Sequence, residues 1–138
     1  MNPQKLVLWV IWTAFVSSIF IFRLILGVNE PKEIALDALG FALLIGPMGA
    51  TVFVRWLLIP KAKSYVSVTP LFIAGMAISE SINFFGLFMF SYFQDVYFAI
   101  ALVAALQFFP GFINIGSEGK DHITPLSKYE TKDFYKEE

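Results

Sequence analysis

Four long apolar segments, separated by short polar stretches, constrain the fold of this chain more than any other feature. A membrane-spanning helix needs about 20 apolar residues, and each segment reaches that length. Because lipid offers the backbone no hydrogen-bond partner, such segments are stable there as helices. We therefore predict an all-α polytopic membrane protein with four transmembrane helices in a bundle. The predicted spans cover about residues 6–26, 34–59, 70–93 and 96–115, which form one domain, residues 1–115.

The composition favours a membrane protein and argues against several other classes. Hydrophobic residues make up 57% of the chain and charged residues 15%, whereas soluble domains carry about 25% charged residues. The net charge is −1 and there is no dense basic cluster, so we expect the lipid bilayer and no nucleic acid as a partner. The chain has no cysteine, which removes thiolate metal ligands and thiol nucleophiles.

The distribution of lysine and arginine predicts the orientation. Four spans place both termini on the same side, and eight of the ten basic residues then lie on that side. Cytoplasmic segments are enriched in Lys and Arg, so we expect the bacterial inner (plasma) membrane with cytoplasmic N- and C-termini. Residues 116–138 are polar and acidic, and we expect a solvated, flexible tail.

Glu80 is the one ionisable residue of the third predicted span and lies near its centre. An acidic group near the bilayer midplane costs at least a few kcal/mol and marks a functional site by default. A neutral glutamine could make similar hydrogen bonds without that cost. Arg23 and Arg55 lie near the ends of their spans, where they can extend towards water. We therefore expect Glu80 to be protonated at neutral pH unless a cation is bound.

Several polar side chains share the predicted depth of Glu80. Each can join neighbouring helices, a contribution of about 0.6 to 2 kcal/mol, or supply oxygen to a cation at Glu80. Ser17 and Ser18 of the first span belong to this group. The predicted ion-binding set is Glu80, Ser81, Asn83, Gln107 and Ser79.

Small residues and one proline shape the second and third spans. A proline inside a helix removes one backbone hydrogen bond and favours a kink, here near mid-membrane. Small residues let helices approach closely in lipid. The predicted kink and packing positions are Pro47, Gly46, Gly49, Gly75 and Gly86. Because one small bundle offers little room to shelter an acid, we expect a homo-oligomer or a subunit of a larger membrane complex.

Residues 74–90, AGMAISESINFFGLFMF, resemble the ion-carrying helix of rotary ATPase c subunits (proteolipids). The similarity lies in the acid followed by small and apolar residues, Glu80-Ser81-Ile82, and in the aromatic-Gly-Leu triplet Phe85-Gly86-Leu87. The resemblance implies that Glu80 binds the transported proton or sodium ion and that Ser81 contributes a sodium ligand. It also implies that the basic residues 61–63 precede this helix on the cytoplasmic side.

The favoured function is a small membrane protein that binds or translocates a proton or small cation through Glu80. It would act as a channel, a transporter or a rotor-like subunit. One alternative is a non-transporting subunit or assembly factor in which Glu80 is an interhelical hydrogen-bonding group; another is a carrier for a small cationic solute. There is no His/Asp/Glu cluster at metal spacing, no phosphate-binding loop and no serine with an evident base. We therefore predict no enzymatic activity, no metal site and no cofactor other than H⁺ or Na⁺.

Overall fold

The computed structural model describes residues 3–27, 35, 37–113 and 115, and this part of the chain is helical with no strand. The prediction of an all-α fold is confirmed. Four segments are long and apolar enough to cross a membrane: Pro3–Leu26, Ala38–Lys61, Tyr65–Phe88 and Ser91–Phe112. The predicted flexible tail, residues 116–138, lies outside the described residues. In chain order the helical elements are α1 (Pro3–Leu26), α2 (Ala38–Phe53), η1 (Val54–Leu58), η2 (Ile59–Lys61), α3 (Tyr65–Phe88), η3 (Ser91–Phe93), α4 (Gln94–Leu106) and η4 (Pro110–Phe112).

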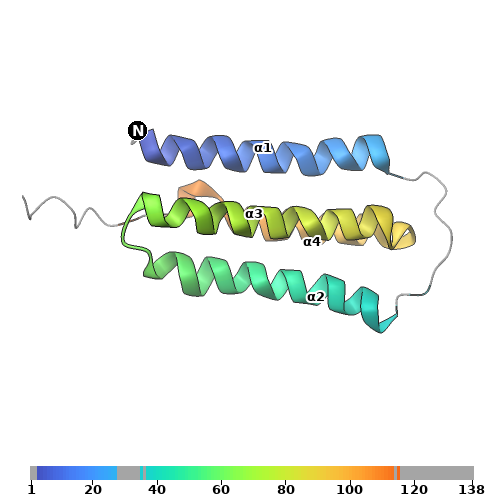
Figure 1. The fold of residues 1–138 in the computed structure, drawn as a ribbon. Coiled ribbons are helices and arrows are strands. Elements are labelled where there is room, and N and C mark those ends of the chain that lie inside the picture. Colours follow the sequence, from blue (N-terminus) through green and yellow to red (C-terminus); the bar gives the residue numbers. More distant parts are fainter. Residues whose placement is uncertain (1–2, 28–34, 36, 114, 116–138) are drawn as a thin grey trace, which may run out of the picture.

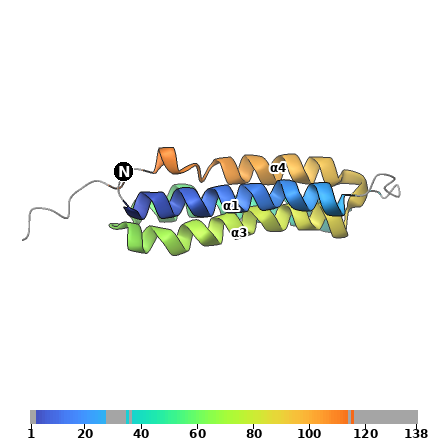
Figure 2. The same ribbon diagram turned by 90° about the horizontal axis from the view of Figure 1, so that it is seen from above.

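The helices α3 and α4 form a central pair, and α1 and α2 flank this pair on opposite sides (Figure 1). Figure 2 shows α1 running over both α3 and α4. Within the described residues α1 and α2 make no contact with each other, whereas α3 packs against all three other helices. The helix that carries Glu80 is therefore the most enclosed of the four.

The start of α3 lies five residues before the start of the predicted span at residue 70. Ser64 caps this helix, because its hydroxyl accepts from the Ser67 N–H and the Ser67 hydroxyl accepts from the Ser64 N–H. The helix also ends earlier, at Phe88. Glu80 therefore lies three to four residues beyond the middle of α3, an offset of about 5 Å along the axis. Its expected depth near the bilayer midplane stays a prediction.

The second helical segment begins later than predicted and ends in irregular helix. Asp37 is the N-cap of α2 and its carboxylate accepts from the Gly40 N–H at 2.9 Å. Asp is a favoured N-cap residue, which explains a start at Ala38. Pro47 lies inside α2, and the helix changes to a π-helix at Val54–Leu58. Such wider turns are uncommon and are often found at functional sites.

The α-helix of the fourth span is shorter than predicted, because α4 ends at Leu106 rather than near residue 115. Pro110 explains the break, since the residue before a proline is disfavoured in the α conformation. That residue, Phe109, has extended backbone with ψ of 121°. The end of α4 leaves backbone carbonyl groups without helical partners inside the membrane-length segment, and these groups need other donors.

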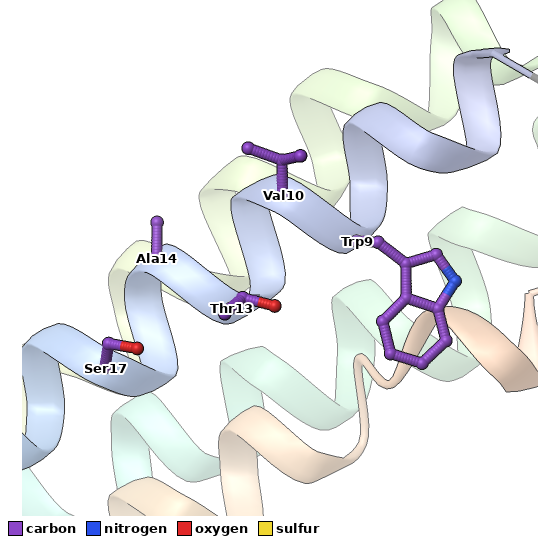
Figure 3. Close-up of a pocket in the computed structure, with 5 residues that line it drawn as sticks. All are labelled: Trp9, Val10, Thr13, Ala14 and Ser17. Atoms are coloured by element: carbon purple, nitrogen blue, oxygen red, sulfur yellow. The ribbon is translucent and has the colours of Figure 1, made fainter.

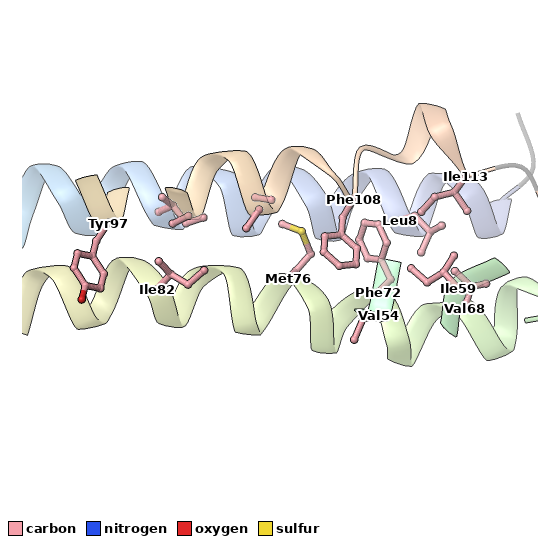
Figure 4. Close-up of a cluster of buried hydrophobic side chains, with 14 of the residues drawn as sticks. Leu8, Val54, Ile59, Val68, Phe72, Met76, Ile82, Tyr97, Phe108 and Ile113 are labelled. Carbon is pink, nitrogen blue, oxygen red and sulfur yellow. The ribbon is translucent and has the colours of Figure 1, made fainter. Parts of the chain in front are cut away.

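Two glycines of α3 bring α3 and α4 close together. A Cβ added at Gly75 would lie 2.1 Å from the ring of Phe108, and one added at Gly86 would lie 2.4 Å from the Tyr97 Cβ. Gly46 and Gly49 of α2 have no such neighbour within 4 Å. Around the α3–α4 contact the bundle has a continuous apolar core that extends to α1 and α2 (Figure 4). Its most enclosed side chains include Leu8, Ile19, Val68, Phe72, Met76, Ile82, Tyr97 and Phe108.

Candidate functional site

Glu80 meets α1 at Ser18, whose hydroxyl donates a hydrogen bond to Oε1 of Glu80. The carboxylate is half-buried between the two helices. The Ser18 hydroxyl also lies 2.8 Å from the backbone carbonyl oxygen of Phe15 in its own helix. Sequence reasoning placed Ser18 at the depth of Glu80 but did not assign it as a partner of the carboxylate.

The Ser18 hydroxyl has two acceptors within hydrogen-bond distance, the Glu80 carboxylate and the Phe15 carbonyl. A serine hydroxyl carries one hydrogen and can make one full donor bond. An ionised Glu80 would compete with the Phe15 carbonyl for that hydrogen. With a protonated Glu80, the carboxyl hydrogen can bond to the Ser18 oxygen while the Ser18 hydrogen bonds to Phe15. Both acceptors are then satisfied. The protonation state expected from the sequence stays a prediction.

Asn83, one turn after Glu80, also reaches α1. Its side chain is fully buried, and its Nδ2 donates to the carbonyl oxygen of Ile19 at 3.2 Å. The other amide atom, Oδ1, is buried and has no hydrogen-bond partner in the described part of the chain. Buried polar atoms without a partner are rare in native structures and call for an explanation.

The remaining predicted ligands do not bond to the carboxylate in the described structure. The hydroxyls of Ser79 and Ser81 donate within α3, to the carbonyl oxygens of Gly75 at 2.9 Å and Ile78 at 2.7 Å. Gln107 lies beside Met48, with its Nε2 3.9 Å from the thioether sulfur. The next residue, Phe108, covers Gly75, which precedes Glu80 by about 7.5 Å of helical rise. The structure thus brings Glu80 together with Ser18 and Asn83, and the expected depth of Gln107 was wrong.

Arg55 is buried, contrary to the expectation that it extends towards water. Its side chain is 8% exposed. Its Nε donates to the Gln107 carbonyl oxygen at 2.6 Å and its Nη2 to the Phe112 carbonyl oxygen at 3.3 Å. The guanidinium carbon lies 5.3 Å from the ring centroid of Trp56. These carbonyls become available because α4 ends at Leu106, so the break in α4 explains the burial of the arginine.

The π-helix helps to direct Arg55 inward. Thr51, Val54 and Arg55 are buried, and the next buried residue is Ile59 rather than Leu58. A π turn holds more residues than an α turn. The wider turn therefore shifts the inward face by one position after Arg55. Trp12 of α1 stabilises the same end of α4, since its Nε1 donates to the carbonyl oxygen of Ala105 at 3.0 Å.

Glu80 and Arg55 do not form an ion pair. Arg55 lies about 8 Å from the middle of Ala38–Lys61, towards η2, whereas Glu80 is displaced towards the opposite end of the bundle. One ion pair joins Arg23 of α1 and Asp95 of α4, where the Asp95 side chain is 81% exposed. Glu80 therefore has no compensating cation in the described structure.

A shallow groove of about 420 Å³ lies on the surface of α1 (Figure 3). It is lined by Trp9, Val10, Thr13, Ala14 and Ser17. The lining is mostly apolar, with two hydroxyls and no ionisable group. Ser17 belongs to this outer surface and is exposed, whereas its neighbour Ser18 faces Glu80.

Comparisons of the chain with known protein families, with curated proteins and with solved structures give no match. The resemblance of residues 74–90 to the ion-carrying helix of c subunits therefore stays a prediction from the sequence.

Proposed function

We propose that this protein is a small integral membrane protein that binds or translocates a proton or small cation through Glu80. The observation that carries the proposal is the contact between Glu80 and Ser18, formed by two helices of membrane-spanning length. Glu80 has no paired cation among the described residues, so the loss of its proton would leave an uncompensated negative charge in lipid. Such a charge favours the binding of another proton or a cation, which is the property needed for ion exchange.

The proposed reaction is reversible proton loss from the Glu80 carboxyl group. The proton leaves to water, and either another proton or a cation restores neutrality. Ser18 positions the carboxyl group from α1, and the α3–α4 contact holds α3 in place. The protein would act as a channel, a transporter or a rotor-like subunit, in line with the local resemblance of residues 74–90.

The location and assembly are part of the same proposal. We place the protein in a bacterial inner membrane with cytoplasmic termini, on the distribution of Lys and Arg. The outward-facing Gly46 and Gly49 of α2, which have no neighbour within 4 Å, support close packing of a further copy in a homo-oligomer. A place in a larger membrane complex is equally compatible with this surface.

A structural role is the second candidate, because the same hydrogen bond joins α1 to α3. Glu80 would then fasten two helices in a non-transporting subunit or assembly factor. This role predicts that Glu80→Gln retains assembly, since a glutamine can also bond to Ser18, and that deletion of residues 116–138 abolishes it.

Carbodiimide labelling together with ion flux tests the proposal. In liposomes containing the purified full chain, the reagent should modify Glu80, because it reacts with protonated carboxyl groups in apolar surroundings. Glu80→Gln should lower proton flux to that of empty liposomes. Asp95→Asn is the matched control, since Asp95 is exposed, and should leave flux unchanged. A Glu80 that stays unlabelled at every accessible pH, with Glu80→Gln conducting as wild type, would show the proposal to be wrong.

A further inference from the structure

Glu80 and Asn83 of α3 both contact α1, at two consecutive residues of that helix. Glu80 and Asn83 are one turn apart on α3, so both project to the same side. Their partners on α1 are the consecutive residues Ser18 and Ile19. The carboxylate of Glu80, the hydroxyl of Ser18 and the amide oxygen of Asn83 therefore lie along the same short stretch of this interface.

The amide of Asn83 is oriented so that its oxygen is the free atom. Its nitrogen donates to the Ile19 carbonyl, and the reverse orientation would place two carbonyl oxygens against each other. The oxygen Oδ1 is left buried with no donor in the described residues. A buried oxygen that lacks a donor is a suitable ligand for a hard cation, which binds carboxylate, carbonyl and hydroxyl oxygens.

Ser18 can also present its oxygen to a cation. When a cation is bound to the ionised Glu80, its charge repels the Ser18 hydrogen, which can then bond to the Phe15 carbonyl 2.8 Å away. The lone pairs of the hydroxyl oxygen then face the carboxylate side. The site would offer oxygen ligands with one negative charge, so a monovalent cation would leave it neutral, as a proton does.

Other charges do not compensate this site. On α1 the nearest cation along the helix is Arg23, about 7.5 Å of rise beyond Ser18 and paired with Asp95 of α4. On η1, Arg55 is held by the carbonyls of Gln107 and Phe112. On α3 itself Glu80 is the one ionisable group between Phe72 and Phe88. The charge of the carboxylate is thus available to a bound ion.

We propose that the carboxylate of Glu80, the hydroxyl of Ser18 and the unpaired amide oxygen of Asn83 form a sodium site, in which Na⁺ replaces the carboxyl proton of Glu80. The exchange is balanced: the O–H bond of the carboxyl group breaks, the proton leaves to water, and Na⁺ takes its place with no change in net charge. This inference rests on the proposed ion-binding role of Glu80 and adds the second ion and its ligands.

Protection of Glu80 from carbodiimide provides the test. The full-length protein in liposomes is labelled at fixed pH in sodium chloride or in choline chloride at equal ionic strength. The labelling rate at Glu80 should fall with sodium, because only the protonated carboxyl group reacts. Ser18→Ala and Asn83→Leu should each raise the half-protecting sodium concentration by about tenfold or more, the effect of losing one bond to a charged group.

Matched variants separate a ligand role from a structural one. Ser17→Ala changes the exposed neighbour of Ser18 and should leave the half-protecting concentration unchanged, and Ser18→Thr keeps a hydroxyl and should retain protection. Asn83→Leu removes the buried unpaired oxygen and also the bond to the Ile19 carbonyl, so the free energy of unfolding of this variant is measured beside its sodium protection. If Glu80 is labelled equally in sodium and choline, or if both Ser18→Ala and Asn83→Leu keep wild-type protection, the sodium site is wrong while the proton role stands. If Glu80 is never labelled, both proposals fail.

Discussion

Arg55 and Glu80 are both enclosed by the membrane-length helices, and their side chains are held in opposite ways. Arg55, on η1, donates to two backbone carbonyls of the segment that follows α4 and lies beside Trp56. Glu80, at the contact of α1 with α3, has one hydrogen bond and a neighbouring amide oxygen without a partner. Arginine stays charged in proteins, whereas a carboxyl group can gain or lose a proton.

This difference indicates which of the two side chains can change its charge. The carbonyl groups around Arg55 lack helical partners because α4 ends at Leu106, so they can accept hydrogen bonds from a permanently charged side chain. These hydrogen bonds join η1 to the segment that follows α4. Glu80 accepts one hydrogen bond from Ser18, and the unpaired amide oxygen of Asn83 lies one turn away on the same helix. We infer that Arg55 stabilises the bundle and that Glu80 exchanges an ion. Substitutions should therefore separate stability from ion exchange.

The largest loss of stability is expected from Arg55→Ala. The carbonyl oxygens of Gln107 and Phe112 would lose their charged donor, at a cost of about 2 to 4 kcal/mol in the free energy of unfolding. Denaturation of the purified protein in mixed micelles measures this value. Lys61→Ala, an exposed basic residue at the end of the same segment, is the control and should change stability by less than about 0.5 kcal/mol. Equal effects of the two substitutions would contradict the anchoring role of Arg55.

The next largest effect concerns the α3–α4 contact that both regions share. Gly75→Ala would place a Cβ 2.1 Å from the Phe108 ring. The helices must move apart, at a cost of about 1 to 3 kcal/mol in the free energy of unfolding. Gly49→Ala has no atom within 4 Å to meet and should be neutral or slightly stabilising, because alanine favours helix over glycine. The same micelle denaturation compares them, and an equally destabilising Gly49→Ala would refute the stated packing.

Glu80→Gln should change stability little but abolish ion exchange. A glutamine can still bond to Ser18, so we expect a change in unfolding free energy within about 1 kcal/mol. Proton flux into liposomes should fall to the background of empty liposomes, since an amide does not titrate.

Arg55→Lys is the opposite case, because it keeps the charge but loses one of two carbonyl bonds. Arg55→Lys should lower the free energy of unfolding by about 1.5 to 3 kcal/mol and leave carbodiimide labelling of Glu80 intact.

The smallest effect is expected from Ser18→Ala, about 0.6 kcal/mol, the average for a hydrogen bond between membrane helices. A double-mutant cycle with Glu80→Gln should give a coupling energy of similar size, because the two side chains are bonded. Ser17→Ala in the same cycle should give none. Coupling at Ser17 but not at Ser18 would mean that α1 presents a different face to α3.

Much of the fold could be predicted from sequence because it depends on local properties. The length and apolarity of each segment predict a span whatever its neighbours are, and all four were identified. The ends of the helices were harder to predict from the sequence. Ser64 and Ser67 form a capping box that a sequence pattern could have revealed, and Pro110 predicts the break after α4, yet both signals are shared with ordinary loops.

The candidate site could be predicted only in part from the sequence, for a different reason. Glu80 stands out in any reading, and Asn83 lies one turn away on the same helix. Ser18 as its partner, and the separation of Gln107 from it, depend on how α1 and α4 are rotated and shifted against α3. No local sequence pattern specifies this rotation and shift. Ser17 and Ser18, for example, are the same residue type at nearly the same predicted depth.

The sequence by itself determined that four helices suited to lipid would form and that one of them would carry an acid. Only the tertiary structure decided that Ser18 rather than Ser17 faces this acid, that Asn83 keeps an unpaired oxygen, and that Arg55 turns inward. The physical reason is that burial in lipid acts on each segment separately. The partner of a polar side chain, by contrast, depends on close packing at Gly75 and Gly86 and on the carbonyls exposed where α4 ends.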